Sequence, residues 1–405
     1  MKKKWIAAAV PGLMAILAVA GRLVLSYKSV KFDLDESLIV KNPDYNVTLS
    51  VVDGYTTLTK PGGNFKVIGF TDTHLDGKKE KGDITLEYIV RNVVNEKPDL
   101  VVFVGDNVTG GLNAKRVKQL GSTMEKLGVY WAFVLGNHEG DNIWSVTRKT
   151  MVKRFAKYKY CIAEPGSRYT SDKEKVAGYG NYVVNLADTD GTVSRSLFFI
   201  DGGAYMSKED MEKYDAEIFD KDHNDYDYVK DSQMKWYKET VADIAKKAGH
   251  PVKSTVFDHI PLTEFRLAYE EITGEKEVTM KEPEYNVPNE SGDYILMGRR
   301  WETICHPGHN SGFFDVLKET GSTDLVVSGH DHVNDFVLSY KGIVLSYNVP
   351  SGYSSYNLMS SKRADYLLQG FTRYTFSNDG SFKLEQVHNE DLYPEAQPVI
   401  QALYR

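Results

Sequence analysis

The chain has 405 residues, of which 41% are hydrophobic and 26% are charged, and this is the ordinary range of a globular protein with a sizeable core. Its formal net charge of -7 argues against general nucleic-acid binding, because a phosphate backbone is held mainly by Lys and Arg. The charge does not exclude a small phosphorylated substrate, since bound divalent cations would dominate the field at such a site.

The first 27 residues have the pattern of an export signal. Three lysines precede an apolar stretch that begins at Trp5, as in a basic n-region followed by an apolar h-region. Cleavage after Ala20 would release the protein, whereas continuation to Leu25 approaches the roughly 20 apolar residues that span a bilayer. The sequence therefore predicts an extracytoplasmic protein, either secreted or associated with a membrane through residues 5–27.

Residues 28–405 are expected to form a single domain, with insertions at about 140–250 and 266–300. An N-terminal hairpin within residues 28–60 leads into a region where apolar runs alternate with helical periodicity. Strands are predicted at 65–70, 100–104 and 130–135, and helices at 84–95 and 114–127. Alternating β and α segments of this length predict a mostly parallel sheet.

Further elements follow along the chain. Helices are predicted at 145–157 and 231–247, and strands at 182–186, 197–200, 254–257 and 325–328. Four short segments separated by turn signals are predicted as strands at 336–340, 343–347, 370–376 and 382–387. We expect these last four strands to form an antiparallel sheet.

Five polar clusters come directly after, or at the end of, five of the apolar runs. They are Asp72-Thr73-His74, Gly105-Asp106-Asn107, Gly136-Asn137-His138-Glu139, Asp258-His259 and Gly329-His330-Asp331-His332. Open α/β sheets bind ligands at one edge, beyond the carboxyl ends of their strands, so these side chains should converge.

The clusters contain the ligands that a site for two metal ions needs. A metal pair can hold a phosphoester and generate a hydroxide nucleophile. Asp72 and His74 are two residues apart, so in an extended strand end they would point to the same side and bind one ion. Asp106 is the expected bridge between the ions. Oxygen and imidazole ligands without thiolates favour two divalent or transition-metal ions, such as Fe, Mn or Zn.

The remaining ligands are divided between the two ions. His332 would complete the first, and the second would take Asn137, His259 and His330. Asn107, beside the expected bridge, is a candidate substrate contact.

The ordered series D-x-H, G-D-x, G-N-H-E, H and G-H-x-H resembles the calcineurin-like metallophosphoesterase superfamily. It is similar to the branch that contains the dose-dependent cell-cycle regulator phosphatase and purple-acid-phosphatase-like proteins. The resemblance implies an α/β fold of two packed mixed β-sheets flanked by helices, a four-layer αββα sandwich. It also implies the ligand assignment given above.

The same resemblance implies roles for two residues that do not bind metal. His138 would contact substrate and protonate the leaving oxygen, and Glu139 would orient His138. Purple enzymes carry a tyrosine three residues after the bridging aspartate, where this chain has Thr109, so an iron-tyrosinate centre is not implied.

The leading functional hypothesis is metal-dependent hydrolysis of a small phosphorylated substrate, as a monoester or a diester. One alternative is cleavage of phospholipid or sphingolipid headgroups at a membrane, which a rim of Tyr205, Tyr353 and Tyr356 would favour. Another is a non-catalytic surface binding protein. Cys161 and Cys305 are expected to be buried thiols, although they could pair if exported, and the oligomeric state is open.

Overall fold

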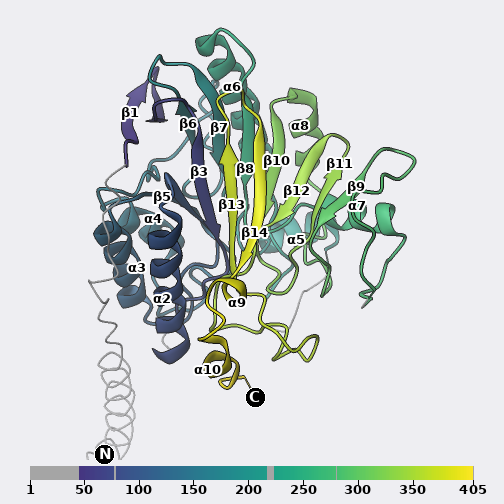
Figure 1. The fold of residues 1–405 in the computed structure, drawn as a ribbon. Helices are drawn as coiled ribbons and strands as arrows, with labels where there is room; N and C mark the ends of the chain where they lie inside the picture. The colour runs from purple at the N-terminus through teal and green to yellow at the C-terminus, as the bar shows by residue number, and fades with distance from the viewer. Residues whose placement is uncertain (1–44, 77–78, 217–222, 280, 405) are drawn as a thin grey trace, which may run out of the picture.

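The computed structural model describes residues 45–76, 79–216, 223–279 and 281–404 (Figure 1). It contains two mixed β-sheets that pack against each other and are flanked by helices. The predicted fold class is therefore confirmed. The predicted export signal lies outside the described residues.

The larger sheet has nine strands in the order β1-β2-β6-β7-β8-β10-β12-β11-β9. Its inner strands pair in parallel from β7 through β8 and β10 to β12. The strand bounds are β1 (Thr48–Val52), β2 (Tyr55–Thr59), β6 (Tyr182–Ala187), β7 (Val193–Phe199), β8 (Lys253–Phe257), β9 (Tyr294–Met297), β10 (Thr323–Ser328), β11 (Val337–Tyr340) and β12 (Ile343–Tyr347).

The smaller sheet has five strands in the order β14-β13-β3-β4-β5. The three strands nearest the N-terminus run parallel, and β13 and β14 add antiparallel at one side. Their bounds are β3 (Phe65–Phe70), β4 (Leu100–Val104), β5 (Tyr130–Val134), β13 (Gly370–Phe376) and β14 (Phe382–His388).

Helices cover the outer faces of the sandwich (Figure 1). The helices α2, α3 and α4 share a core with the smaller sheet, whereas α6, α7 and α8 pack on the larger one. The helix bounds are α2 (Lys79–Glu96), α3 (Ala114–Leu127), α4 (Arg148–Phe155), α5 (Lys208–Tyr214), α6 (Asp231–Ala248), α7 (Thr263–Thr273), α8 (Phe313–Thr320), α9 (Asn389–Leu392) and α10 (Gln397–Gln401).

Strand β10 shows why the predicted strands are apolar without alternation. Leu325 and Val327 belong to the core between the sheets, and Val326 belongs to the core beneath the helices. A strand covered on both faces has no solvent-facing positions, so its apolar run is continuous.

The predicted C-terminal antiparallel sheet is wrong. The four strands are divided between the two sheets: β11 and β12 join the larger sheet and β13 and β14 the smaller one. Strand β12 pairs in parallel with β10, a partner that lies before β11 in the chain. Turn signals predict where a strand ends, but they do not reveal which strand it pairs with across the molecule.

The region 140–250, which was predicted as an insertion, contains part of the larger sheet. It supplies β6 and β7, which lie inside the larger sheet and are almost entirely buried. Residues 266–300 lie at the opposite side of that sheet and end in the edge strand β9. Among the described residues, no helix is long and apolar enough to cross a membrane.

Candidate metal centre

All five polar clusters follow the carboxyl ends of strands, and within each sheet these strands run parallel. Three clusters come from the smaller sheet, after β3, β4 and β5, and two come from the larger sheet, after β8 and β10. The structure brings most of the predicted ligands into two overlapping groups. One consists of Asp72, His74, Asp106 and His332, and the other of Asp106, His259 and His330.

Asp106 belongs to both groups, as a bridging carboxylate must. Its Oδ2 atom lies 3.5 Å from Nε2 of His74 and 3.3 Å from Nε2 of His259. In each group the ligand atoms all lie within 4.8 Å of one another. A cation placed within either group could therefore contact several ligands at once.

The imidazole rings are turned so that Nε2 faces this centre. Nδ1 of His259 donates to the carbonyl oxygen of Val104 at 2.8 Å, and Nδ1 of His332 lies 2.5 Å from the hydroxyl of Ser355. Nε2 of His332 is 2.9 Å from Nε2 of His74. Hydrogen bonds from the second ring nitrogen are the usual way in which proteins orient metal-binding histidines.

Several buried polar atoms at the centre have no hydrogen-bond partner. They are Asp72 Oδ1, Asp106 Oδ2, Asn137 Oδ1, His259 Nε2 and His330 Nε2. Buried polar atoms of native proteins are nearly always satisfied, so this concentration of acceptors requires an explanation. Two metal ions would use every one of these atoms, and the donor set fits divalent transition metals.

Burial keeps two of the histidines in the form that binds metal. It lowers the pKa of His74 to about 3, with a further contribution from the neighbouring His332. Burial and the proximity of His259 also lower the pKa of His330 to about 3. Both rings are therefore neutral at physiological pH, and neutral imidazole is the ligand form.

The ligand backbone is not extended, contrary to the prediction for Asp72 and His74. Their φ angles are 52° and 42°, and Asp106 and His330 also have positive values of 48° and 79°. Non-glycine residues rarely adopt this region, which costs on the order of 1–3 kcal/mol per residue. The ligands converge because the chain turns sharply after each strand, and not because side chains alternate along it.

Two glycines allow the loops to approach one another. A Cβ atom on Gly105 would overlap the ring of His259, and one on Gly329 would overlap the hydroxyl of Thr71. Gly105 also has a φ of 87°. The glycines that precede Asp106 and His330 are therefore required by packing between the two sheets.

Glu139 organises the loops and does not orient His138, so that prediction is wrong. Its two carboxylate oxygens accept hydrogen bonds from four backbone N–H groups. The donors are Gly136 at 2.6 Å, Asp106 at 3.2 Å, Asn107 at 2.5 Å and Val108 at 3.2 Å. Burial raises the pKa of Glu139 to about 7, while the Gly136 N–H acts in the opposite direction. The side chain ties the loop after β4 to the loop after β5.

The carboxylate that contacts His138 belongs to Asp141. Its Oδ2 atom lies against Nδ1 of the ring, and the backbone N–H of His138 donates to Asp106 at 2.8 Å. Burial opposes ionisation of the ring, but Asp106 and Asp141 outweigh it and raise the pKa of His138 to about 9. His138 is partly exposed, so it can reach a substrate.

Asn107 is fully buried, and its Nδ2 donates to the carbonyl oxygen of Val134 at 2.9 Å. The Nδ2 atom thus links the ends of β4 and β5, whereas the Oδ1 atom has no hydrogen-bond partner, and the substrate contact of Asn107 stays a prediction.

The three rim tyrosines have different positions. Tyr205 accepts a hydrogen bond from Asn137 at 3.1 Å, and Tyr356 is 43% exposed with its ring 4.5 Å from that of His332. Both adjoin the metal centre. Tyr353 is 1% exposed and packs on Tyr88, so it is a core residue and not part of a rim.

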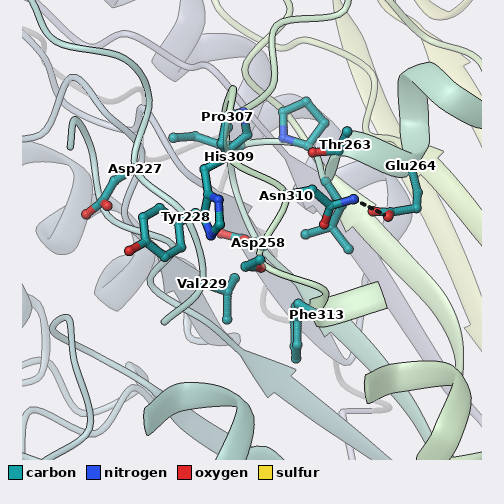
Figure 2. Close-up of a pocket in the computed structure, with 14 residues that line it drawn as sticks. Asp227, Tyr228, Val229, Asp258, Thr263, Glu264, Pro307, His309, Asn310 and Phe313 are labelled. Carbon is teal, nitrogen blue, oxygen red and sulfur yellow. Dashed lines mark hydrogen bonds between the residues drawn. The ribbon is translucent and has the colours of Figure 1, made fainter. Parts of the chain in front are cut away.

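His309, which lies outside the ligand clusters, lines a separate small cavity beside Asp258 (Figure 2). Its ring stacks on Tyr214 with the centroids 3.6 Å apart. The cavity encloses about 20 Å³, room for about one water molecule. Both cysteines are free thiols; Cys161 is buried and Cys305 is partly buried.

The chain is similar to several known proteins. Residues 65–334 match the family model for the calcineurin-like phosphoesterase. The chain is 32% identical over 329 residues to a protein named "Probable inactive purple acid phosphatase 14" from Arabidopsis thaliana, covering 73% of this chain and 72% of the relative. It is 29% identical to "Phosphatase DCR2" from Saccharomyces cerevisiae, and this match covers 68% of this chain and 45% of that protein. A solved dimetal phosphatase from Danio rerio aligns with 81% of this chain and 98% of its own, at 12% identity and a TM-score of 0.47.

Proposed function

Because the chain belongs to the calcineurin-like phosphoesterase family, we propose that it hydrolyses phosphate esters of small molecules at a centre of two metal ions. One observation carries the proposal: buried oxygen and nitrogen atoms from five strand ends converge on one point and have no other partners. As part of the same proposal, the two ions are Fe, Mn or Zn.

Each part of the centre has a distinct task in this reaction. Asp72, His74, Asp106 and His332 would hold one ion, and Asp106, Asn137, His259 and His330 the other. When bound, such ions activate water and withdraw charge from the phosphoryl oxygens. The strands and loops around these ligand side chains bury them and hold them in position.

His138 acts on the leaving oxygen. Its Nδ1 contacts Asp141, which leaves Nε2 as the nitrogen that can pass a proton to the departing alkoxide. The ring lies 5.5 Å from that of His74, so the acid is beside the first group of ligands. Asp141 is a positioning residue, because it acts through His138 and not on the substrate.

The test is hydrolysis of chromogenic phosphate monoesters and diesters by protein loaded with Mn, Fe or Zn. We expect the wild-type chain to hydrolyse at least one ester type, and Asp106→Asn to lose this activity together with bound metal. Absence of hydrolysis in every metal form, with Asp106→Asn behaving identically, would contradict the proposal.

A non-catalytic binding protein is the second candidate, favoured by a relative whose name includes "inactive". Elemental analysis and hydrolysis together separate the two. Two ions per chain with turnover support the enzyme. Less than one ion per chain after reconstitution, without turnover, supports the binding protein.

We also propose an extracytoplasmic location, which the basic and apolar segment at the N-terminus supports. Fractionation of cells that express the full chain, compared with a chain lacking residues 1–27, tests this proposal. Equal retention of both forms inside the cell would contradict it.

A further inference from the structure

The turn directly after His138 exposes two large apolar side chains. Ile143 is 89% exposed and Trp144 is 61% exposed. The other tryptophans of the described residues, Trp131, Trp236 and Trp301, are at most 7% exposed. A neighbouring pair of large exposed apolar residues is a common mark of a binding surface.

This turn is held in place by hydrogen bonds at both ends. The backbone N–H of Trp144 donates to the side chain of Asn142 at 2.9 Å, and that of Leu112 donates to the carbonyl of Trp144 at 3.1 Å. The N–H of Val146 donates to the side chain of Asn113 at 2.8 Å. Since the backbone is fixed, the apolar pair is presented to solvent in a defined position.

The same turn is part of the metal centre's surroundings. Asp141, two residues before Ile143, contacts the ring of His138. The segment that supports the turn from the other side, Leu112 and Asn113, follows Asp106 after a few residues. The apolar pair therefore belongs to the same turn as Asp141, the residue that contacts the proposed acid His138.

From this arrangement we propose that Ile143 and Trp144 bind the organic part of the substrate, so that the preferred substrates are phosphate esters with an apolar alkyl or aryl leaving group. The inference rests on the proposed function, because it assigns a substrate class to the same site. The phosphoryl group would face the metal ligands, and the apolar substituent would extend past His138 onto the two side chains.

The position of the turn favours a substrate substituent as the occupant, because Asp141 of the same turn contacts His138. Three exposed basic residues, Lys149, Lys153 and Arg154, follow the apolar pair on α4, and anionic bilayers attract such residues. A membrane is therefore the competing occupant that the vesicle measurement below addresses.

The kinetic test compares methyl and octyl esters of whichever ester type the wild-type chain hydrolyses, because their leaving oxygens have similar basicity. We expect kcat/KM to be about tenfold or more higher for the octyl ester. The double substitution Ile143→Ser with Trp144→Ser should remove this preference by lowering kcat/KM for the octyl ester to about the value for the methyl ester. Val51→Ser, at a position that is 73% exposed on β1, is the matched control and should preserve the preference.

A binding measurement does not depend on turnover. Octylphosphonate, but not methylphosphonate, should shift the tryptophan emission of the metal-loaded protein to shorter wavelength, and Trp144→Phe should abolish the shift. If this shift occurs but no ester is hydrolysed, the proposed function fails and the apolar site stands. Equal kcat/KM for both esters would overturn the inference alone. So would a Trp144-dependent effect seen only with phosphatidylcholine vesicles, which would identify the pair as a membrane contact.

Discussion

Glu139→Gln is the substitution that most directly tests how the metal centre is built. Each carboxylate oxygen of Glu139 accepts two backbone N–H groups, and glutamine replaces one oxygen with an NH₂ group. Two of the buried backbone N–H groups would then face the new NH₂ group, which is itself a hydrogen-bond donor. At about 1–3 kcal/mol for each unsatisfied group, the free energy of unfolding should fall by about 2–6 kcal/mol.

The same substitution should weaken metal binding. The four donors belong to the loops that carry Asp106 and Asn137, so their displacement moves ligands of both ions. We expect metal affinity to fall by about 10–100-fold, the usual effect of losing an outer contact to a ligand. Urea unfolding of the metal-free chain and metal titration measure the two quantities independently.

Asp141→Asn is the matched control, because it removes the other nearby carboxylate from an exposed position. Its effect should depend on the leaving group: turnover of alkyl esters should fall, by at most the roughly 10²–10⁴-fold that a general acid contributes, whereas nitrophenyl esters should change little. Its stability should change by about 0.5 kcal/mol or less. The reasoning is refuted if Glu139→Gln keeps its stability and metal affinity and shows the leaving-group effect instead.

Three further results are expected. Asp106→Asn should reduce bound metal from two ions to less than one per chain, measured by elemental analysis, because Asp106 belongs to both ligand groups; retention of two ions would contradict the bridging role. Chelation should lower the melting temperature, since ions present at 1,000 times their dissociation constant stabilise a fold by about 4 kcal/mol per site; an unchanged melting temperature would argue against tight binding. Gly329→Ala should destabilise the chain by about 1–3 kcal/mol in urea unfolding, since its methyl group would overlap the Thr71 hydroxyl, and a neutral result would show that the loops can separate.

The fold was predictable where local pattern and tertiary environment agree. The apolar run at 100–104 predicted a buried strand, and β4 occupies those residues with every position buried. Pairing across the molecule was not predictable in the same way. The strand predicted at 343–347 was expected to pair in antiparallel with the one predicted at 336–340, and β12 does pair in this way with β11. Its other side, however, pairs in parallel with β10.

The metal ligands could be predicted from the sequence, but the residues that hold the ligands and His138 in position were harder to predict. Imidazole and carboxylate groups after strand ends indicate a metal centre from residue type alone. The partner of His138 depends on the turn that follows it. Gly140 has a φ of 100° and redirects the chain, so that Asp141 meets the ring while Glu139 points into the loops. The single aspartate in the turn directly after G-N-H-E was the signal that could have identified Asp141.

The strain at the ligands argues for a retained metal function. Four ligands, Asp72, His74, Asp106 and His330, combine unfavourable φ angles with nearly complete burial. Contacts within the protein hold this geometry; for example, the backbone N–H of His330 donates to Asp72 at 2.9 Å. In a purely structural role, both the strain and the unsatisfied buried atoms would only destabilise the fold. Proteins depart from local rules in this way mainly where function requires it, and a metal centre formed by these four ligands is such a function.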